Sequence, residues 1–167
     1  MTNLWFSQRD PILKIDKLYV KDLICKVPNS AYLFGTTKFK ELLTSIVPSH
    51  GVITKIQSIS QIKYEVTLHA ILKLQAKNIN LLDLQVQQAG IFTLNILQIQ
   101  VKPVLENHCA GLLQPYLSKT IYHTMTQAGF PPIVLQSRSD LKSSNKELKI
   151  KNFLNKELLS KDKFKIN

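Results

Sequence analysis

The segment KYEVTLHAILKLQ, residues 63–75, has the clearest periodicity in the chain. Its apolar side chains recur at every second position, namely Tyr64, Val66, Leu68, Ala70, Leu72 and Leu74. Successive side chains of a β-strand point to opposite faces of a sheet, so this alternation predicts a strand with one buried face. His69 falls on the polar face and is expected to be solvated.

A second strand is predicted directly after the first. The polar turn at residues 77–80 leads into Leu82, Leu84 and Val86, which alternate with polar residues. Two alternating runs joined by a short polar turn are typical of an antiparallel hairpin. Gly90 is expected to end or bend the second strand.

Upstream, residues 12–27 carry apolar side chains at most odd positions, which predicts a long strand that stops at Pro28. A weaker strand is predicted over residues 40–47, ended by Pro48. The stretch 52–62 is ambiguous by periodicity.

After Pro103 the pattern favours helices. A short helix is expected around residues 104–112, and a second helix is expected to carry Pro115 in its first turn. Leu117, Ile121 and Met125 follow at a spacing of four residues, and Gly129 is suited to cap the helix end. In the tail, Ser144 and Glu147 suggest a capping box before a weak amphipathic helix.

Strands first and helices afterwards predict an α+β fold, with helices on one face of a four-stranded antiparallel sheet. We assign residues 1–136 to the domain and residues 137–167 to a Lys-rich tail that is partly helical or disordered. A fold of this size covers its apolar surface poorly, so a sheet face and the Leu117–Ile121–Met125 stripe are expected to stay partly exposed. Self-association or binding of another chain would use that surface.

The charge and cysteine content argue against several classes of protein. The net charge of +11 is spread as +4 over residues 1–60, +2 over 61–136 and +5 over 137–167, with lysine far more frequent than arginine. This distribution argues against a specific nucleic-acid reader, although a basic nucleic-acid-binding module stays an alternative. Two cysteines without a Cys-x-x-Cys pair, and no apolar run long enough for a membrane span, favour a reducing cytoplasm.

No catalytic pattern emerges from the sequence. Nucleotide-binding glycine loops are absent, and the carboxylates are scattered. His108 adjoins Cys109, but neighbouring helical side chains diverge by about 100°, so a packed cysteine beside a surface histidine is the favoured interpretation. We therefore expect no enzyme activity, no metal and no cofactor.

Four stretches together resemble the SecB family of protein-export chaperones. They are residues 15–30 (IDKLYVKDL with VPNS), residues 64–68 (YEVTL), residues 86–92 (VQQAGIF), and a helix opened by Pro115-Tyr116 and closed by Gly129-Phe130-Pro131. The similarity spans about residues 13–135, apart from a loop around residues 47–62 that looks longer than usual in the family.

The resemblance implies a chaperone that binds unfolded precursor proteins without ATP and delivers them to the SecA motor, as a homotetramer built as a dimer of dimers. It also implies several groups of site residues. The groove for the unfolded substrate is expected at Phe34, Leu42, Ile46 and Phe130. The motor-docking face is expected at Asp22, Lys26 and Gln85, and the oligomer interface at Tyr19, Cys109, Leu117 and Ile121.

The chain also departs from the pattern of the family. SecB proteins are usually acidic on the docking face, whereas Lys26 and Gln85 stand at two expected acidic positions. The helix expected after Phe130-Pro131 lacks its usual core and becomes Arg138-Ser139-Asp140-Leu141-Lys142. A SecB-like chaperone dedicated to a toxin–antitoxin pair is the alternative within the family.

Overall fold

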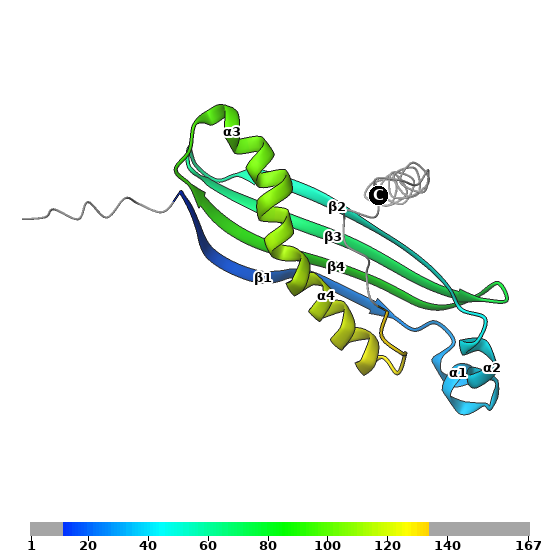
Figure 1. The fold of residues 1–167 in the computed structure, drawn as a ribbon. Coiled ribbons are helices and arrows are strands. Elements are labelled where there is room, and N and C mark those ends of the chain that lie inside the picture. Colours follow the sequence, from blue (N-terminus) through cyan, green and yellow to red (C-terminus); the bar gives the residue numbers. More distant parts are fainter. Residues whose placement is uncertain (1–11, 134–167) are drawn as a thin grey trace, which may run out of the picture.

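The computed structural model describes residues 12–133. The predicted tail and its capping box lie outside these residues. The described part contains four strands, two short helices and a long helical rod (Figure 1). In chain order the elements are β1 (Leu13–Lys26), α1 (Ser30–Gly35), α2 (Lys38–Leu43), β2 (Val47–Ser58), β3 (Lys63–Ala76), β4 (Ile79–Leu94), α3 (Gln98–Pro103), the π-helical segment η1 (Val104–Cys109) and α4 (Ala110–Gln127).

The four strands form one antiparallel sheet in the order β1-β4-β3-β2. The predicted hairpin is confirmed as β3–β4, in which Ala76 pairs with Ile79 across a turn of two residues. Lys77 and Asn78 both have positive φ, of 49° and 64°, as the tightest hairpin turns require. The alternating apolar residues of 64–74 are all buried, so the predicted face of β3 is confirmed.

A helical rod covers one face of this sheet (Figure 1). It buries one residue in every four, namely Val101, Leu105, Cys109, Leu113, Leu117, Ile121 and Met125. On an ideal α-helix a spacing of four drifts by about 40° per step. The wider π-helical turn of η1 rotates in the opposite sense and helps to keep the stripe against β3 and β4.

The rod corrects the prediction of two helices separated at Pro115. Pro115 lies inside α4, and Pro103 ends α3 without ending the rod. The packing of the buried stripe on the sheet outweighs the backbone hydrogen bonds that the two prolines cannot donate. In addition, the side-chain amide of Asn107 donates a hydrogen bond to the Pro103 carbonyl at 3.1 Å. The predicted partial exposure of Leu117, Ile121 and Met125 is wrong for the same reason, because all three are 0–1% exposed within a single chain.

Three further predictions need correction. Residues 40–47 were expected to be a strand, but α2 occupies Lys38–Leu43, because Phe39 and Leu42 at a helical spacing both pack on the core. The loop expected around residues 47–62, which includes the ambiguous stretch 52–62, is mostly the edge strand β2. Gly90 does not end β4, which continues to Leu94.

Strand β1 contains two bulges that change its pattern. The register slips by one residue between Ile15 and Lys17 and again between Val20 and Asp22. Each slip moves the following residues to the opposite face. The side of β1 facing the rod is therefore wholly apolar, and it comprises Leu13, Ile15, Leu18, Val20, Leu23 and Cys25.

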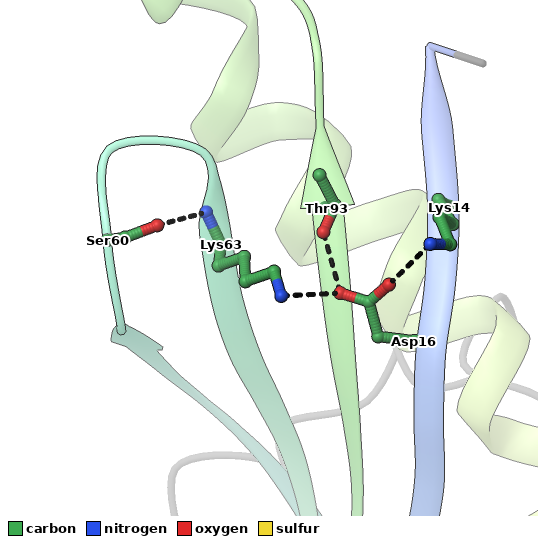
Figure 2. A network of polar contacts seen from close by, with 5 residues as sticks. All are labelled: Lys14, Asp16, Ser60, Lys63 and Thr93. Carbon is green, nitrogen blue, oxygen red and sulfur yellow. Dashed lines mark hydrogen bonds and ion pairs between the residues drawn. The ribbon is translucent and has the colours of Figure 1, made fainter. Parts of the chain in front are cut away.

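The two bulged residues, Asp16 and Lys21, reach across the opposite side of the sheet, which we call the outer face. The Asp16 carboxylate accepts a hydrogen bond from the Thr93 hydroxyl at 2.6 Å and lies 3.6 Å from the Lys63 ammonium (Figure 2). The Lys21 ammonium donates to Glu65 at 2.6 Å. The Asp16–Lys63 and Lys21–Glu65 contacts pass over β4 and end on β3, so the bulges fasten the edge strand to the centre of the sheet.

Gly90 allows the rod to approach the sheet. A Cβ at this position would lie 2.8 Å from the Phe92 ring, 2.9 Å from Leu113 and 3.0 Å from Leu18. These side chains come from β4, α4 and β1 and pack in or against the core, so at least one of them must shift to accommodate an added methyl group.

We predict that Gly90→Ala lowers the free energy of unfolding by about 2 kcal/mol, because the added methyl group overpacks the core. Gly111→Ala is the matched control, since a Cβ there would meet nothing within 4 Å and alanine stabilises a helix by about 0.5–1 kcal/mol over glycine. Urea unfolding of both variants measures the difference. An unchanged stability for Gly90→Ala would contradict the close packing described above.

Candidate functional site

An aromatic cluster, which we call the aromatic corner, lies where α1, α2 and the end of α4 meet. Phe34, Phe39 and Phe130 pack edge to face, with ring centroids 5.0–5.9 Å apart. Phe130 is buried, whereas Phe34 is 48% exposed. The aromatic corner therefore presents the half-exposed ring of Phe34 on an apolar base formed by Phe39 and Phe130.

The end of α4 positions Phe130. Gly129 adopts a φ of 84°, the Phe130 amide donates to the Met125 carbonyl, and the Gly129 amide donates to Thr126. This is a Schellman motif, so the predicted glycine cap is confirmed. A Cβ on Gly129 would lie 3.1 Å from the Phe34 ring, so glycine also lets α1 approach the helix end.

The predicted groove residues lie around this corner at different depths. Phe34 and Phe130 are in direct ring contact. Leu42 is buried with 5% exposure and Ile46 is half-buried against the core, so both belong to the base of the corner. Phe39 was missed, because the strand predicted for residues 40–47 hid its helical spacing to Leu42. The three-residue spacing was the signal that could have found it.

The predicted motor-docking residues lie together on the outer face. Cα pairing places Asp22 opposite Gln87, Lys26 opposite Asp83, and Gln85 opposite Ile24. The three residues occupy neighbouring positions on β1 and β4, and their side chains point to the same face of the sheet. The face is therefore polar and mixed in charge at this end.

Further along the outer face, Glu65 is held by two side chains. The Tyr19 hydroxyl donates to one carboxylate oxygen, and the Lys21 ammonium donates to the other. These hydrogen bonds, that of Lys21 first, lower the pKa of Glu65. The hydrogen bond to Glu65, with burial as a second cause, raises the pKa of Tyr19 to about 12. Glu65 thus stays ionised and Tyr19 stays neutral over the physiological range.

The predicted oligomer-interface residues are mostly inside the subunit. Cys109, Leu117 and Ile121 are buried against the sheet, and burial raises the pKa of the Cys109 thiol to about 11. Tyr19 is half-buried beside Glu65. The packed cysteine beside an exposed histidine, His108, is confirmed. The exposed side of α4 instead carries Tyr116 and Tyr122.

No group of three or more potential metal ligands occurs within residues 12–133. Over the same residues, no helix is long and apolar enough to cross a membrane.

A family model described as "Preprotein translocase subunit SecB" matches residues 7–138. The chain belongs to the SecB family. Among curated relatives, the protein-export protein SecB of Nitrosomonas europaea is 34% identical over 130 residues, which cover 77% of this chain and 78% of the relative. The SecB of Nitrosomonas eutropha is 36% identical over 129 residues, with the same coverage.

The fold agrees with this membership in the SecB family. A solved SecB-like chaperone of Mycobacterium tuberculosis, in complex with a ChAD peptide from an antitoxin, superposes with a TM-score of 0.58 at 12% identity. The match covers 75% of this chain and 89% of that one. At this identity the likeness concerns the fold alone.

The lowered pKa of Glu65 predicts a pH-dependent stability for this SecB-family chain. A carboxylate with a lowered folded-state pKa stabilises the fold above its unfolded value of 4.5, and the contribution is lost as the pH falls through the folded pKa. Glu65→Gln should therefore be less stable than the parent chain at pH 7, and the difference should shrink below pH 4.5. Denaturant unfolding at pH 7 and at about pH 3 measures it; a constant difference would refute the role of the charged form.

Proposed function

We propose that the chain is a cytoplasmic export chaperone that binds unfolded precursor proteins at the aromatic corner, without ATP, and delivers them to the SecA motor. The half-exposed ring of Phe34 carries this proposal. Two edge-to-face contacts hold this ring against Phe39 and buried Phe130. A fixed apolar surface binds unfolded chains broadly, because any apolar side chain can bury area against it.

Membership in the SecB family supports the same function, because the curated relatives are named protein-export proteins. Leu42, Ile46 and Phe130 form the support of the corner in this proposal, and Phe34 makes the contact. The motor would dock on the outer face that carries Asp22, Lys26 and Gln85.

We propose further that the subunits form a dimer of dimers. The exposed apolar residues of β1 support edge-to-edge pairing of two sheets, since Ile15, Val20 and Leu23 are 42–46% exposed on a strand with a free edge. Tyr19 lies on the same strand. The exposed Tyr116 and Tyr122 of α4 support the stacking of the two dimers, in place of the buried Leu117 and Ile121.

Phe34→Ala should weaken the binding of unfolded chains about tenfold, since the variant removes a central aromatic anchor. The assay follows the refolding of a slowly folding precursor at a few subunits per substrate chain, and the variant should no longer delay it. Ile99→Ala is the control, because Ile99 is 83% exposed on α3, at the other end of the sheet. Equal holding by the parent chain and Phe34→Ala, with both folded, would refute the proposed site.

Tyr122→Glu should reduce the mass of the assembly measured by light scattering while the subunit stays folded, because Tyr122 is 50% exposed. Ile121→Glu should instead unfold the subunit, because it buries a charge in the core. Circular dichroism separates the two effects. A tetramer that survives Tyr122→Glu would place the stacking surface elsewhere.

A further inference from the structure

The outer face of the sheet carries an excess of positive charge. Three strands contribute lysines to it, and the face also holds a smaller number of acids. The lysines are Lys14, Lys17, Lys21, Lys26, Lys55, Lys63 and Lys73, and the acids are Asp16, Asp22, Glu65 and Asp83.

The acids on this face are largely satisfied by the chain itself. Both oxygens of Glu65 accept hydrogen bonds, from Tyr19 and Lys21. The Asp16 carboxylate lies between Lys14 at 3.5 Å and Lys63 at 3.6 Å (Figure 2). Asp83 accepts from the Asn80 amide at 2.7 Å and lies 4.0 Å from Lys73. Glu65 and Asp16 therefore have little capacity left for a cationic partner, and Asp83 is half-buried beside Lys73.

Three lysines on the same face have no such partner. Lys17, Lys26 and Lys55 are exposed, and none forms an ion pair with any residue of 12–133. Lys17 lies over the Tyr19 ring, 5.9 Å from its centroid. Asp22 on β1 is also exposed and forms no ion pair with any residue of 12–133, so the unpaired charges of the face are three positive and one negative.

A polar hollow of about 390 Å³ lies between these strands. Lys21 lines it from β1 and Lys55 from β2, while Glu65, Thr67 and Gln87 contribute from the central strands. Glu65 is already paired with Lys21. Thr67 is 3% exposed, so it forms part of the base of the hollow. Because Glu65 balances the charge of Lys21, Lys55 is the lysine of the hollow that forms no ion pair with any residue of 12–133.

We propose that the outer face binds an acidic polypeptide segment, seated in the hollow beside Lys55. The unpaired lysines are complementary to carboxylate side chains, and a peptide can align Asp or Glu residues with point charges on separate strands. A nucleic acid fits less well, because the face has neither arginine forks nor exposed stacking aromatics within residues 12–133.

This inference goes beyond the holding of unfolded chains, which uses the aromatic corner at the end of the sheet. It also specifies the chemistry of the partner that docks on the outer face. A protein that recognises this surface through charge presents acidic residues to it.

The test uses the full chain and a fluorescent peptide of alternating glutamate and serine, followed by anisotropy at low ionic strength. The peptide should bind, and binding should weaken as salt is added. Lys55→Glu should weaken binding about fivefold or more, because a reversed charge turns attraction into repulsion. Lys102→Glu, at an exposed position on α3, makes the same change of charge away from the face and should leave binding within about twofold.

Three outcomes would overturn the proposal. The folded parent chain could fail to bind the peptide at low salt, or Lys102→Glu could weaken binding as much as Lys55→Glu, which would show that net charge alone is responsible. A single-stranded oligonucleotide of equal charge could bind more tightly with the same dependence on Lys55, which would favour nucleic acid. The refolding assay with Lys55→Glu separates the two proposals, since holding of the precursor should be unchanged.

Discussion

The packing of the helical rod on β3 and β4 is the constraint on which the rest of the structure depends. One residue in every four, from Val101 to Met125, is buried against the sheet, and Gly90 permits the close approach. A single rod cannot also cover the two edge strands. The apolar side of β1 is therefore left partly exposed, and the end of the rod is available to support Phe130 and, through it, Phe34. Both proposed contact surfaces follow from how far one helix can reach across four strands.

The bulges of β1 separate apolar from charged side chains. Without the two slips in register, Lys17, Tyr19 and Lys21 would share a face with Leu13 and Leu23, as strict alternation predicts. With them, every apolar residue of β1 except Ile24 and Tyr19 points toward the rod, and the charged residues point outward. The extra residue at each bulge, Asp16 or Lys21, bonds across the outer face to β3. Apolar association and ionic docking can therefore occupy opposite sides of the same strand.

The sequence correctly predicted the helices and strands that are determined by their own residue pattern. The predictions failed where contacts with residues distant in the sequence determine the structure. The alternation at residues 64–74 identified β3, and the positions of Gly129 and Phe130 identified the helix end. Local rules placed Pro115 at the start of a helix, because nothing nearby reveals that the stripe from Val101 onward is buried on a sheet. The bulges were equally hidden, since the register of β1 is set by its pairing with β4. The resemblance to the SecB family named Phe34 and Phe130, which the structure brings into ring contact, but including Phe39 required the correct assignment of α2.

The two surfaces of this chain are under different physical constraints. Phe34 contacts Phe130, whose position depends on Gly129 and on the Met125 carbonyl at the end of the buried stripe, so a change at the aromatic corner is transmitted to the core. Lys26 and Gln85 stand on the outer face at positions where the resemblance implies acids, and a change of charge there removes no core contact. The proposed surface for unfolded chains is therefore tied to the core, whereas the charge of the proposed docking face can change without altering the fold.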